Sequence, residues 1–463
     1  MKEPFRPNRH LLSGFPRDFR WGAATSAYQI EGASRSLGKG ESVWDRFCRT
    51  PGKIWEGQSG ETACEHVRFF RQDIALMRRL GLQAYRFSVS WPRVLPQGRG
   101  KVAARGLDFY DRLVDQLLAG GIRPFCTLFH WDYPLALYRK GGWDHADSPQ
   151  WFSDYAEVVA RRIGDRVKSW MTLNEPQIFI WLGHGTGEHA PGERLSIGRQ
   201  LRLVRNVQLA HGRAVMRLRS VLPVSAEIGW AVVGVIKIPF TRRTRDVAAA
   251  RAGTYACAPI NVFNNTLWND PVILGRVAPE ARSGYGRGLP TYSPEDLSMM
   301  AQPVDFLGLN IYSGVVVRAD GHSLPREVPF PVGNPRTAFH WSLTPEAMEW
   351  GPKFLHERYG LPIYITENGL SSCDWVALDG KVHDPQRIDF LHRHLRALLR
   401  GVRQGVPVRG YFQWSLLDNF EWAEGYRQRF GLVHVDFASQ KRTPKDSYDW
   451  YRKVIQNRGS KLG

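Results

Sequence analysis

One pattern recurs along the whole chain: a short apolar run, followed by a stretch whose apolar residues have helical spacing. The runs are rich in β-branched and aromatic residues, as buried parallel strands are. Segments 64–80 and 107–119 place apolar residues three and four apart and stop at a glycine just before the next run. Eight such units without a linker predict the α/β class and a single (β/α)8 TIM barrel. The expected strands are Phe19–Tyr28, Ala84–Trp91, Ile122–Trp131, Val167–Asn174, Ala226–Val233, Val304–Tyr312, Leu361–Glu367 and Val408–Leu416.

The segments after the first, fourth, sixth and seventh runs are longer than a simple turn. Loops at the C-terminal ends of barrel strands surround the active site, so long βα loops there predict a deep pocket. We expect one barrel domain over residues 15–455, with an N-terminal extension at 1–14 and a C-terminal tail at 456–463.

The composition is that of a soluble globular protein, with 43% hydrophobic and 23% charged residues. The 63 Lys and Arg residues outnumber the 44 Asp and Glu residues, which gives a net charge of +19. Such a balance first suggests nucleic acid or an anionic membrane as a partner. The basic residues are scattered, however, and no run of five exists, so we expect neither partner. The arginine-rich segment 236–257 receives no functional assignment.

The five cysteines are widely spaced and form neither a CxxC pair nor a zinc-like set, which favours reduced thiols in a cytoplasmic protein. The first residues lack the apolar stretch of a signal peptide, and no run is long enough for a transmembrane helix. We expect no metal and no cofactor.

Two of the predicted strands end in a glutamate. Thr172-Leu173-Asn174-Glu175 closes the fourth strand and Ile365-Thr366-Glu367 the seventh. These strands lie on opposite sides of an eight-stranded barrel, so both carboxyl groups can face one pocket. Paired carboxyls that flank a pocket are what glycosidic bond cleavage requires. The alternative is a pair of structural glutamates in ion pairs, with Arg86 at the end of the second strand as a natural partner.

Further polar and aromatic residues stand at the other strand ends. Sugars present hydroxyl groups around an apolar ring face and are held by amide, imidazole and carboxylate groups beside aromatic side chains. Each residue alone has a structural explanation: His130 as a core histidine, Trp414 as core filling, Glu421 as a surface charge. Together they favour a sugar-binding pocket. The group includes Gln29, His130, Trp131, Asn310, Tyr312, Trp414, Glu421 and Trp422.

Seven segments, in order along the chain, resemble the signature blocks of glycoside hydrolase family 1, the β-glucosidase family. They are FRWGAATSAYQIEG (19–32), YRFSVSWPRV (85–94), TLFHWDYP (127–134), WMTLNEP (170–176), DFLGLNIYS (305–313), YITENG (364–369) and GYFQWSLLDNFEWAEGYRQRFGL (410–432).

The resemblance implies a retaining β-glucosidase that removes terminal β-D-glucosyl residues from β-glucosides and cellobiose-like oligosaccharides through a covalent intermediate. It implies Glu175 as the general acid/base and Glu367 as the nucleophile. Arg86 and Tyr312 match residues that contact the nucleophile, and Trp341 matches the residue that lines the aglycone side. Asn310 is expected in a supporting role. The implied substrate-binding set is Gln29, His130, Trp131, Asn174, Tyr312, Trp341, Trp414, Glu421, Trp422 and Phe430.

Two other functions remain open on the sequence. A 6-phospho-β-glycosidase would need a phosphate site near Glu421, where Arg427 and Arg429 are the nearest cations and an ionised Glu421 would repel the phosphate. A non-catalytic sugar-binding barrel would be indicated by loss of either glutamate, and both glutamates are present. The oligomeric state and the natural aglycone are not predicted.

Overall fold

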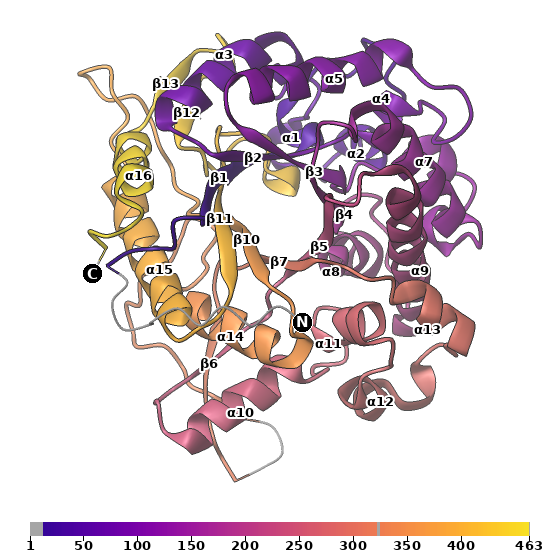
Figure 1. The fold of residues 1–463 in the computed structure, drawn as a ribbon, viewed down its shortest axis with the longest axis vertical. Helices are drawn as coiled ribbons and strands as arrows, with labels where there is room; N and C mark the ends of the chain where they lie inside the picture. Colours follow the sequence, from indigo (N-terminus) through magenta and orange to yellow (C-terminus); the bar gives the residue numbers. More distant parts are fainter. Residues whose placement is uncertain (1–12, 322–324, 463) are drawn as a thin grey trace.

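The computed structural model describes residues 13–321 and 325–462 and has a closed parallel barrel at its centre. Figure 1 looks into the ring of strands, with the connecting helices around it. The order around the ring is β1-β11-β10-β7-β5-β4-β3-β2, and β1 closes it by pairing with both β2 and β11. The predicted fold class is confirmed. The barrel strands are β1 (Arg20–Ala24), β2 (Ala84–Ser88), β3 (Arg123–Phe129), β4 (Ser169–Asn174), β5 (Glu227–Val233), β7 (Phe306–Asn310), β10 (Ile363–Asn368) and β11 (Val408–Trp414).

Helices follow the barrel strands as the periodicity predicts. The longer ones are α3 (His66–Leu80), α5 (Ala104–Ala119), α7 (Ser148–Ile163), α9 (Ile197–Val221), α10 (Thr244–Tyr255), α14 (Ala347–Tyr359), α15 (Pro385–Arg403) and α16 (Asp446–Asn457). Shorter ones are α1 (Ala27–Ile30), α2 (Val43–Cys48), α4 (Trp91–Val94), α6 (Leu135–Tyr138), α8 (Pro176–Ile180), α11 (Thr266–Asn269), α12 (Pro279–Tyr285) and α13 (Pro294–Met300).

The α3 helix shows how the sequence sets this layer. Phe70, Ile74, Met77 and Leu80 recur at helical spacing and are all buried against the barrel, while the opposite face carries charged residues. The helix ends at Gly81, whose φ of 79° lies in the left-handed region that a non-glycine residue rarely adopts.

Several predicted strands are too long at their C-terminal ends. The first strand ends at Ala24 rather than Tyr28, and Gln29 lies in α1. The reason is a contact with a residue 61 positions away: the Ala27 N–H donates to the Ser88 hydroxyl at 2.7 Å, and the chain turns into a helix. The second strand likewise ends at Ser88, because Trp91 begins α4.

The interior of the barrel is filled by side chains. Phe125, Met171, Phe306, Tyr364 and Phe412 form one buried apolar cluster inside the ring. Gly22 makes room for it, because a Cβ atom there would lie 2.4 Å from the Phe412 ring. A substrate therefore has no passage through the barrel and can reach only its open end.

The segment after β5 is long as well, which the sequence analysis did not predict. It carries β6 (Lys237–Pro239) and α10, and it contains the arginine-rich stretch. With β8 (Val315–Arg318) and β9 (Arg326–Glu327), β6 forms a small sheet outside the ring, and Arg242 binds the buried Glu349 carboxylate through two hydrogen bonds of 2.8–2.9 Å. This segment, at the bottom of Figure 1, thus has a structural role.

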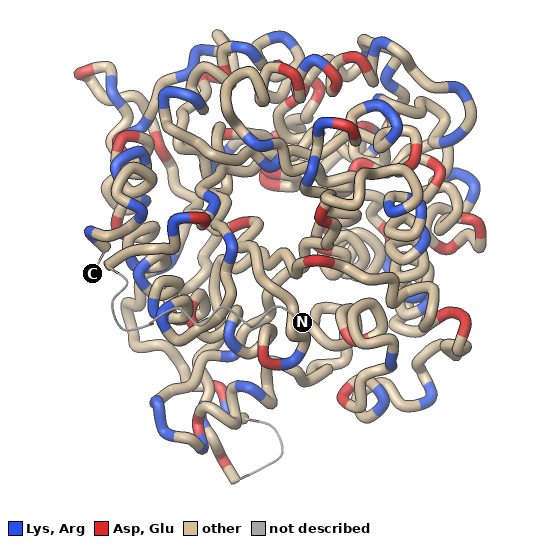
Figure 2. Tube along the Cα trace, in the orientation of Figure 1, with Lys and Arg blue, Asp and Glu red and all other residues tan. Residues whose placement is uncertain are grey.

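Along the backbone of the outer helices, positions of Lys and Arg are mixed with positions of Asp and Glu, as Figure 2 shows. No helix in the described ranges is long and apolar enough to cross a membrane. All five cysteines are free, and all except Cys373 are buried. The proposed extension 1–14 lies outside the described residues apart from its last two, and the proposed tail boundary at 456 stays a prediction.

A buried network of charges ties the loops after β10 and β11 to α15 and α16. The Lys445 ammonium donates to Asp418 at 2.7 Å and also to Asp374. Arg387 binds Asp374 and Asp384, and Arg429 binds Asp418 at 2.8 Å. The sequence analysis missed this network, because its members are distant along the chain. It fixes the segment that carries Glu421 and Phe430 into the barrel mouth.

Replacement of Lys445 by Met is expected to destabilise the fold by about 3–5 kcal/mol, because two buried carboxylates lose their shared cation. Urea unfolding and the melting temperature measure this loss. Lys453→Met, at an exposed position on the same helix, is the matched control and should change stability by less than about 0.5 kcal/mol. Equal stabilities for the two variants would contradict the structural role of the network.

Candidate active site

The two glutamates line one cavity at the C-terminal end of the barrel. Glu367 lies in β10, and Glu175 directly follows β4, three positions away around the ring. Their cavity has a volume of about 810 Å³, within the range of small-molecule sites. It also contains Asn310, Tyr312 and nine-tenths-buried Glu421. The long-loop pocket that the sequence predicts is therefore present, and its floor is the filled barrel interior.

Glu367 is held from two sides. The Arg86 guanidinium donates to one carboxylate oxygen at 2.5 Å, and the Tyr312 hydroxyl donates to the other at 2.7 Å. Burial raises the pKa of Glu367, and Arg86 and Tyr312 oppose that rise. Of the two glutamates, Glu367 is therefore the one whose ionised form is stabilised by a cation in direct contact. The ion pair with Arg86, expected from the sequence as the alternative to a catalytic role, is present. The paired Glu367 carboxylate nevertheless lines the cavity.

Glu175 has a different environment. Its only side-chain hydrogen bond in the described structure comes from the Asn310 amide, at 2.8 Å. Burial, and next the negative charge of Glu367, raise the pKa of Glu175 to about 8. Two neighbouring carboxyl groups with pKa values pushed apart are the arrangement of an acid and a base in one site.

Two asparagines join these groups into one network. The Asn174 side-chain oxygen accepts from Arg86 at 2.6 Å and from Asn310 at 3.0 Å, and its amide group donates to His130 at 3.1 Å. Burial, followed by the charge of Arg86, lowers the pKa of His130 well below its usual range, so the imidazole is neutral. Asn174 lies behind the cavity wall and is completely buried, so it positions the groups that face the cavity.

One wall of the cavity is formed by Trp414, at the end of β11, and by Glu421 and Trp422 in the loop that follows. The Gln29 amide donates to Glu421 at 3.2 Å and to the Phe420 carbonyl at 2.9 Å, which connects α1 to this loop. The His130 ring is stacked within 20° of parallel to both Trp414 and Trp422. Polar groups beside flat aromatic rings are what a sugar ring needs. Gln29, like Asn174, does not itself line the cavity.

Three residues of the site have backbone conformations that side chains rarely adopt. Trp131, Glu175 and Trp422 have φ values of 78°, 46° and 55°. Each such residue costs about 1–3 kcal/mol, and such residues cluster where function fixes a side chain. The Trp131 indole N–H, for example, donates to the Asn174 carbonyl at 3.0 Å, which holds the turn in place.

The outer part of the cavity is aromatic. Trp341 is stacked on Phe339 at 4.8 Å and is next to Tyr312 at 5.2 Å, while Phe430 lies 5.8 Å from Phe339. The sequence analysis named Trp341, Tyr312 and Phe430 but missed Phe339, although an aromatic residue two positions before Trp341 was a visible signal. Trp181 and Phe263 also line the cavity and were missed, because no motif contains them.

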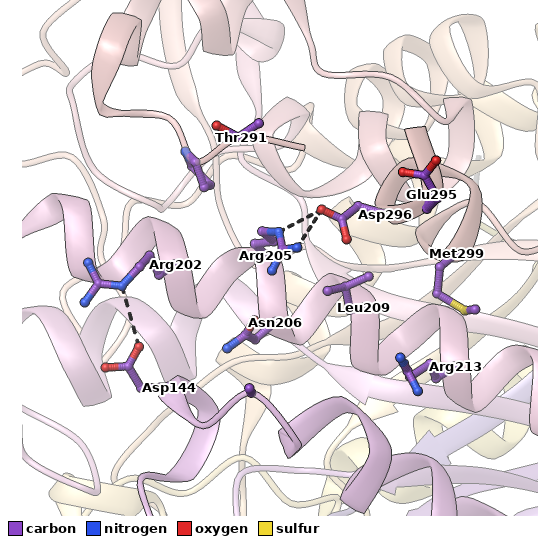
Figure 3. A pocket seen from close by; sticks show the side chains of 12 residues that line it. Asp144, Arg202, Arg205, Asn206, Leu209, Arg213, Thr291, Glu295, Asp296 and Met299 are labelled. Atoms are coloured by element: carbon purple, nitrogen blue, oxygen red, sulfur yellow. Dashed lines mark hydrogen bonds and ion pairs between the residues drawn. The ribbon is translucent and has the colours of Figure 1, made fainter. Parts of the chain in front are cut away.

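A second cavity, of about 650 Å³, lies outside the barrel between α9 and the segment that leads into α13 (Figure 3). Its arginines are already engaged: Arg205 with Asp296 at 2.6 Å, and Arg202 with Asp144 at 3.8 Å. Asp296 also caps α13 through Ser293. Arg213, the third arginine of this cavity, donates to the Gln150 side chain at 2.8 Å. The described residues of this cavity include no counterpart of the Glu175–Glu367 pair, so we assign the active site to the barrel cavity.

The cations needed for a 6-phosphate site are occupied elsewhere. Arg427 is paired with Glu424, Arg429 is paired with Asp418, and neither lines the cavity. Burial and the charge of Glu367 raise the pKa of Glu421 well above its usual range. Glu421 therefore repels a phosphate less than a fully ionised carboxylate would, and among the described residues of the glycone wall no cation is present to bind one.

A closed barrel with two buried carboxyl groups in one aromatic-lined pocket is the arrangement expected of a glycoside hydrolase. Residues 12–460 match glycosyl hydrolase family 1, and the chain belongs to that family. It is 44% identical over 449 residues to beta-glucosidase A of Thermotoga maritima, and the aligned region covers 96% of this chain and 98% of that protein. A 1,4-beta-D-glucan glucohydrolase of Thermotoga neapolitana is also 44% identical, over 97% and 99% of the two chains.

Solved structures agree with the sequences. The beta-glucosidase from Thermotoga maritima in complex with deoxynojirimycin has a TM-score of 0.88 at 42% identity, covering 97% of this chain and all of that one. The complex of the Thermotoga maritima beta-glucosidase with glucoimidazole has the same TM-score at 43% identity. The present chain is thus a β-glucosidase-type hydrolase, as its sequence motifs imply.

Proposed function

We propose that this enzyme hydrolyses terminal, non-reducing β-D-glucosyl residues with retention of configuration, Glu367 acting as the nucleophile and Glu175 as the acid/base. The observation that carries the proposal is the contrast between the two carboxyl groups. Glu367 touches a guanidinium at 2.5 Å, whereas Glu175 receives only a neutral amide bond and has a pKa raised to about 8.

In the first step, a Glu367 carboxylate oxygen attacks the anomeric carbon as the bond to the leaving oxygen breaks. The electron pair of that bond goes to the leaving oxygen, which takes the proton of Glu175. In the second step, Glu175 has lost its proton and accepts one from water. The water oxygen then attacks the anomeric carbon and releases Glu367 as a carboxylate.

The charge on Glu367 couples the two steps. While Glu367 is ionised, its charge helps to keep Glu175 protonated, as the acid role requires. Once Glu367 is esterified by the sugar, that charge is gone and the pKa of Glu175 falls, so Glu175 can serve as the base. Arg86 and Tyr312, each bonded to a different carboxylate oxygen of Glu367, orient the carboxylate for this attack.

The substrates we propose are neutral β-glucosides and cellobiose-like oligosaccharides. The filled barrel interior admits only a chain end, which makes the enzyme exo-acting. His130, Trp414, Glu421 and Trp422 are proposed to hold the glucosyl ring, with Gln29 and Asn174 fixing them from behind. Trp131, Trp341 and Phe430 complete the binding set. We also propose a cytoplasmic location, which agrees with five thiols that form no disulfide.

Retention is tested by following the first-formed anomer by NMR. A nucleophilic Glu367 requires the two carboxyl groups to lie about 5–5.5 Å apart, and two displacements then give a β product from a β-glucoside. The expected initial product is β-glucose. An α-anomer formed before mutarotation would contradict the assignment of Glu367.

The dependence of kcat/KM on pH should be bell-shaped. Activity needs Glu367 ionised, so it falls as the pH drops through the pKa of Glu367; it also needs Glu175 protonated, so it falls as the pH rises through about 8. In Glu175→Gln, assayed with an activated aryl glucoside, the alkaline limb should disappear while the acid limb remains. An alkaline limb that is unchanged in this variant would belong to another group.

A further inference from the structure

The strand that leads to the acid/base is irregular just before its end. Between Met171 and Asn174, strand β4 contains one residue more than the stretch of β5 that pairs with it. Thr172 and Leu173 therefore stand opposite the single residue Trp230. Such a β-bulge bends its strand and changes the direction of the side chains that follow. The side chains that follow here are those of Asn174 and the acid/base.

The strand of the nucleophile has a bulge of the same kind. Leu309 and Asn310 are adjacent in β7, whereas their partners Ile365 and Glu367 in β10 are separated by Thr366. The Thr366 hydroxyl donates to the Asn310 side-chain oxygen at 2.6 Å, so a residue of the site itself fixes this bulge. In the described structure, the side-chain hydrogen bond of the β4 bulge goes instead to the outer helix α9.

His211 of α9 contacts both sides of the β4 bulge. Its Nδ1 atom shares a hydrogen bond of 2.6 Å with the Thr172 hydroxyl. Its ring centroid lies 4.8 Å from that of Trp230, with the two planes 43° apart. All three side chains are completely buried. His211 thus bridges β4 and β5 from outside the barrel, at the point where their pairing shifts register.

The protonation of His211 follows from its surroundings. Burial lowers the pKa of His211 to about 3, so the ring is neutral at the pH where Glu175 titrates, with its pKa of about 8. The Nε2 atom is buried and has no hydrogen-bond partner among the described residues. A proton on Nε2 would be a buried donor without an acceptor, which costs free energy. Nδ1 therefore carries the proton and donates to the Thr172 oxygen.

We propose that His211 is a positioning residue, which holds the β4 bulge and thereby sets the acid/base carboxyl opposite the nucleophile. This proposal rests on the function proposed above, in which Glu175 is the acid/base. The connection is short, because Glu175 follows Thr172 by three residues and donates its backbone N–H to the Ala231 carbonyl of β5 at 2.7 Å. Relaxation of the bulge to regular pairing would turn the residues after it toward the other face of the sheet.

The test compares kcat/KM for cellobiose, which needs the general acid, with that for 2,4-dinitrophenyl glucoside, which does not. In Thr172→Val and His211→Leu, displacement of the acid should lower the cellobiose value about 10- to 100-fold and the dinitrophenyl value less than about threefold. The alkaline limb of kcat/KM on cellobiose should also move to lower pH, because Glu175 would lie farther from the charge of Glu367. Thr172→Ser keeps the hydroxyl and should retain most of the cellobiose value.

Val215→Ala is the matched control for loss of packing. Val215 is completely buried on the same helix, one turn beyond His211. The substitution should lower the melting temperature, as the loss of a buried side chain does, and leave the ratio of the two kcat/KM values within about twofold.

Three outcomes would overturn the positioning role. Equal losses on both substrates in Thr172→Val and His211→Leu would show that His211 supports only the fold. Full activity in both variants would show that the bulge keeps its shape without His211. A loss in Thr172→Ser as large as that in Thr172→Val would exclude the hydrogen bond as the cause.

The proposed function is tested separately by Glu175→Gln. If that variant shows no preference for the activated substrate, the acid/base assignment itself fails. If it does show the preference and the variants of His211 and Thr172 do not, only the positioning role fails.

Discussion

Replacing Glu367 by glycine should reduce kcat by a factor on the order of 10⁴ to 10⁶, the loss expected when a nucleophile is removed from a covalent mechanism. The change removes the buried carboxylate that Arg86 and Tyr312 hold. The other cation-paired carboxylate that lines the cavity, Glu424, is bound to the exposed Arg427 and cannot replace it. Initial rates on an aryl glucoside and on cellobiose measure the loss, which should be large for both substrates.

Two controls separate lost chemistry from lost structure. Glu367→Gly should keep its secondary structure and bind cellobiose, since the hydrogen bonds among Asn174, Asn310 and His130 remain. A small external anion such as azide should enter the space beside Arg86 and attack the anomeric carbon of an activated glucoside. Its nitrogen then forms the new bond as the aryl oxygen leaves, which gives an α-glucosyl azide. A β-configured azide product, or full activity without azide, would rule Glu367 out as the nucleophile.

The sequence predicted the barrel because its strands and helices are encoded locally. Each strand is a short apolar run. Each amphipathic helix, such as α3, has apolar residues at a regular spacing that can be read from the sequence without knowledge of its packing partners. The ends of the strands were predicted less well, because they depend on a partner that is distant in sequence. Ser88, for example, at the end of the neighbouring strand β2 and 61 positions away in sequence, accepts the Ala27 N–H just after β1 ends.

Some residues of the site could be predicted from the sequence and others could not, for the same reason. Glu175, Glu367, Trp414 and Glu421 stand inside motifs, and the structure brings them to one cavity. Phe263 and Trp181 come from two loops that meet only in three dimensions, so neither the spacing nor the composition could associate them. The buried Lys445–Asp418 contact, between residues 27 positions apart, is another such case.

Replacing Glu175 by glutamine should affect substrates according to their leaving groups. For cellobiose, whose leaving alcohol needs a proton, kcat/KM should fall by about 10² to 10⁴, the usual contribution of a general acid. For 2,4-dinitrophenyl glucoside, whose leaving phenolate is stable without a proton, the fall should be below about tenfold. The amide keeps the shape of the side chain and can still contact Asn310, so the wall of the cavity is preserved.

The two kinetic constants of this variant should also separate. Because water attack on the intermediate needs Glu175 as a base, kcat on the dinitrophenyl substrate should drop even though kcat/KM is nearly unchanged, and KM should fall with it as the intermediate accumulates. Glu346→Gln, at an exposed position outside the cavity, is the control and should leave all values within about twofold. Removal of the general acid should lower kcat/KM most for the substrate with the poorer leaving group, which is cellobiose. If Glu175→Gln lowered kcat/KM by equal factors on both substrates, another residue of the cavity would be the proton donor.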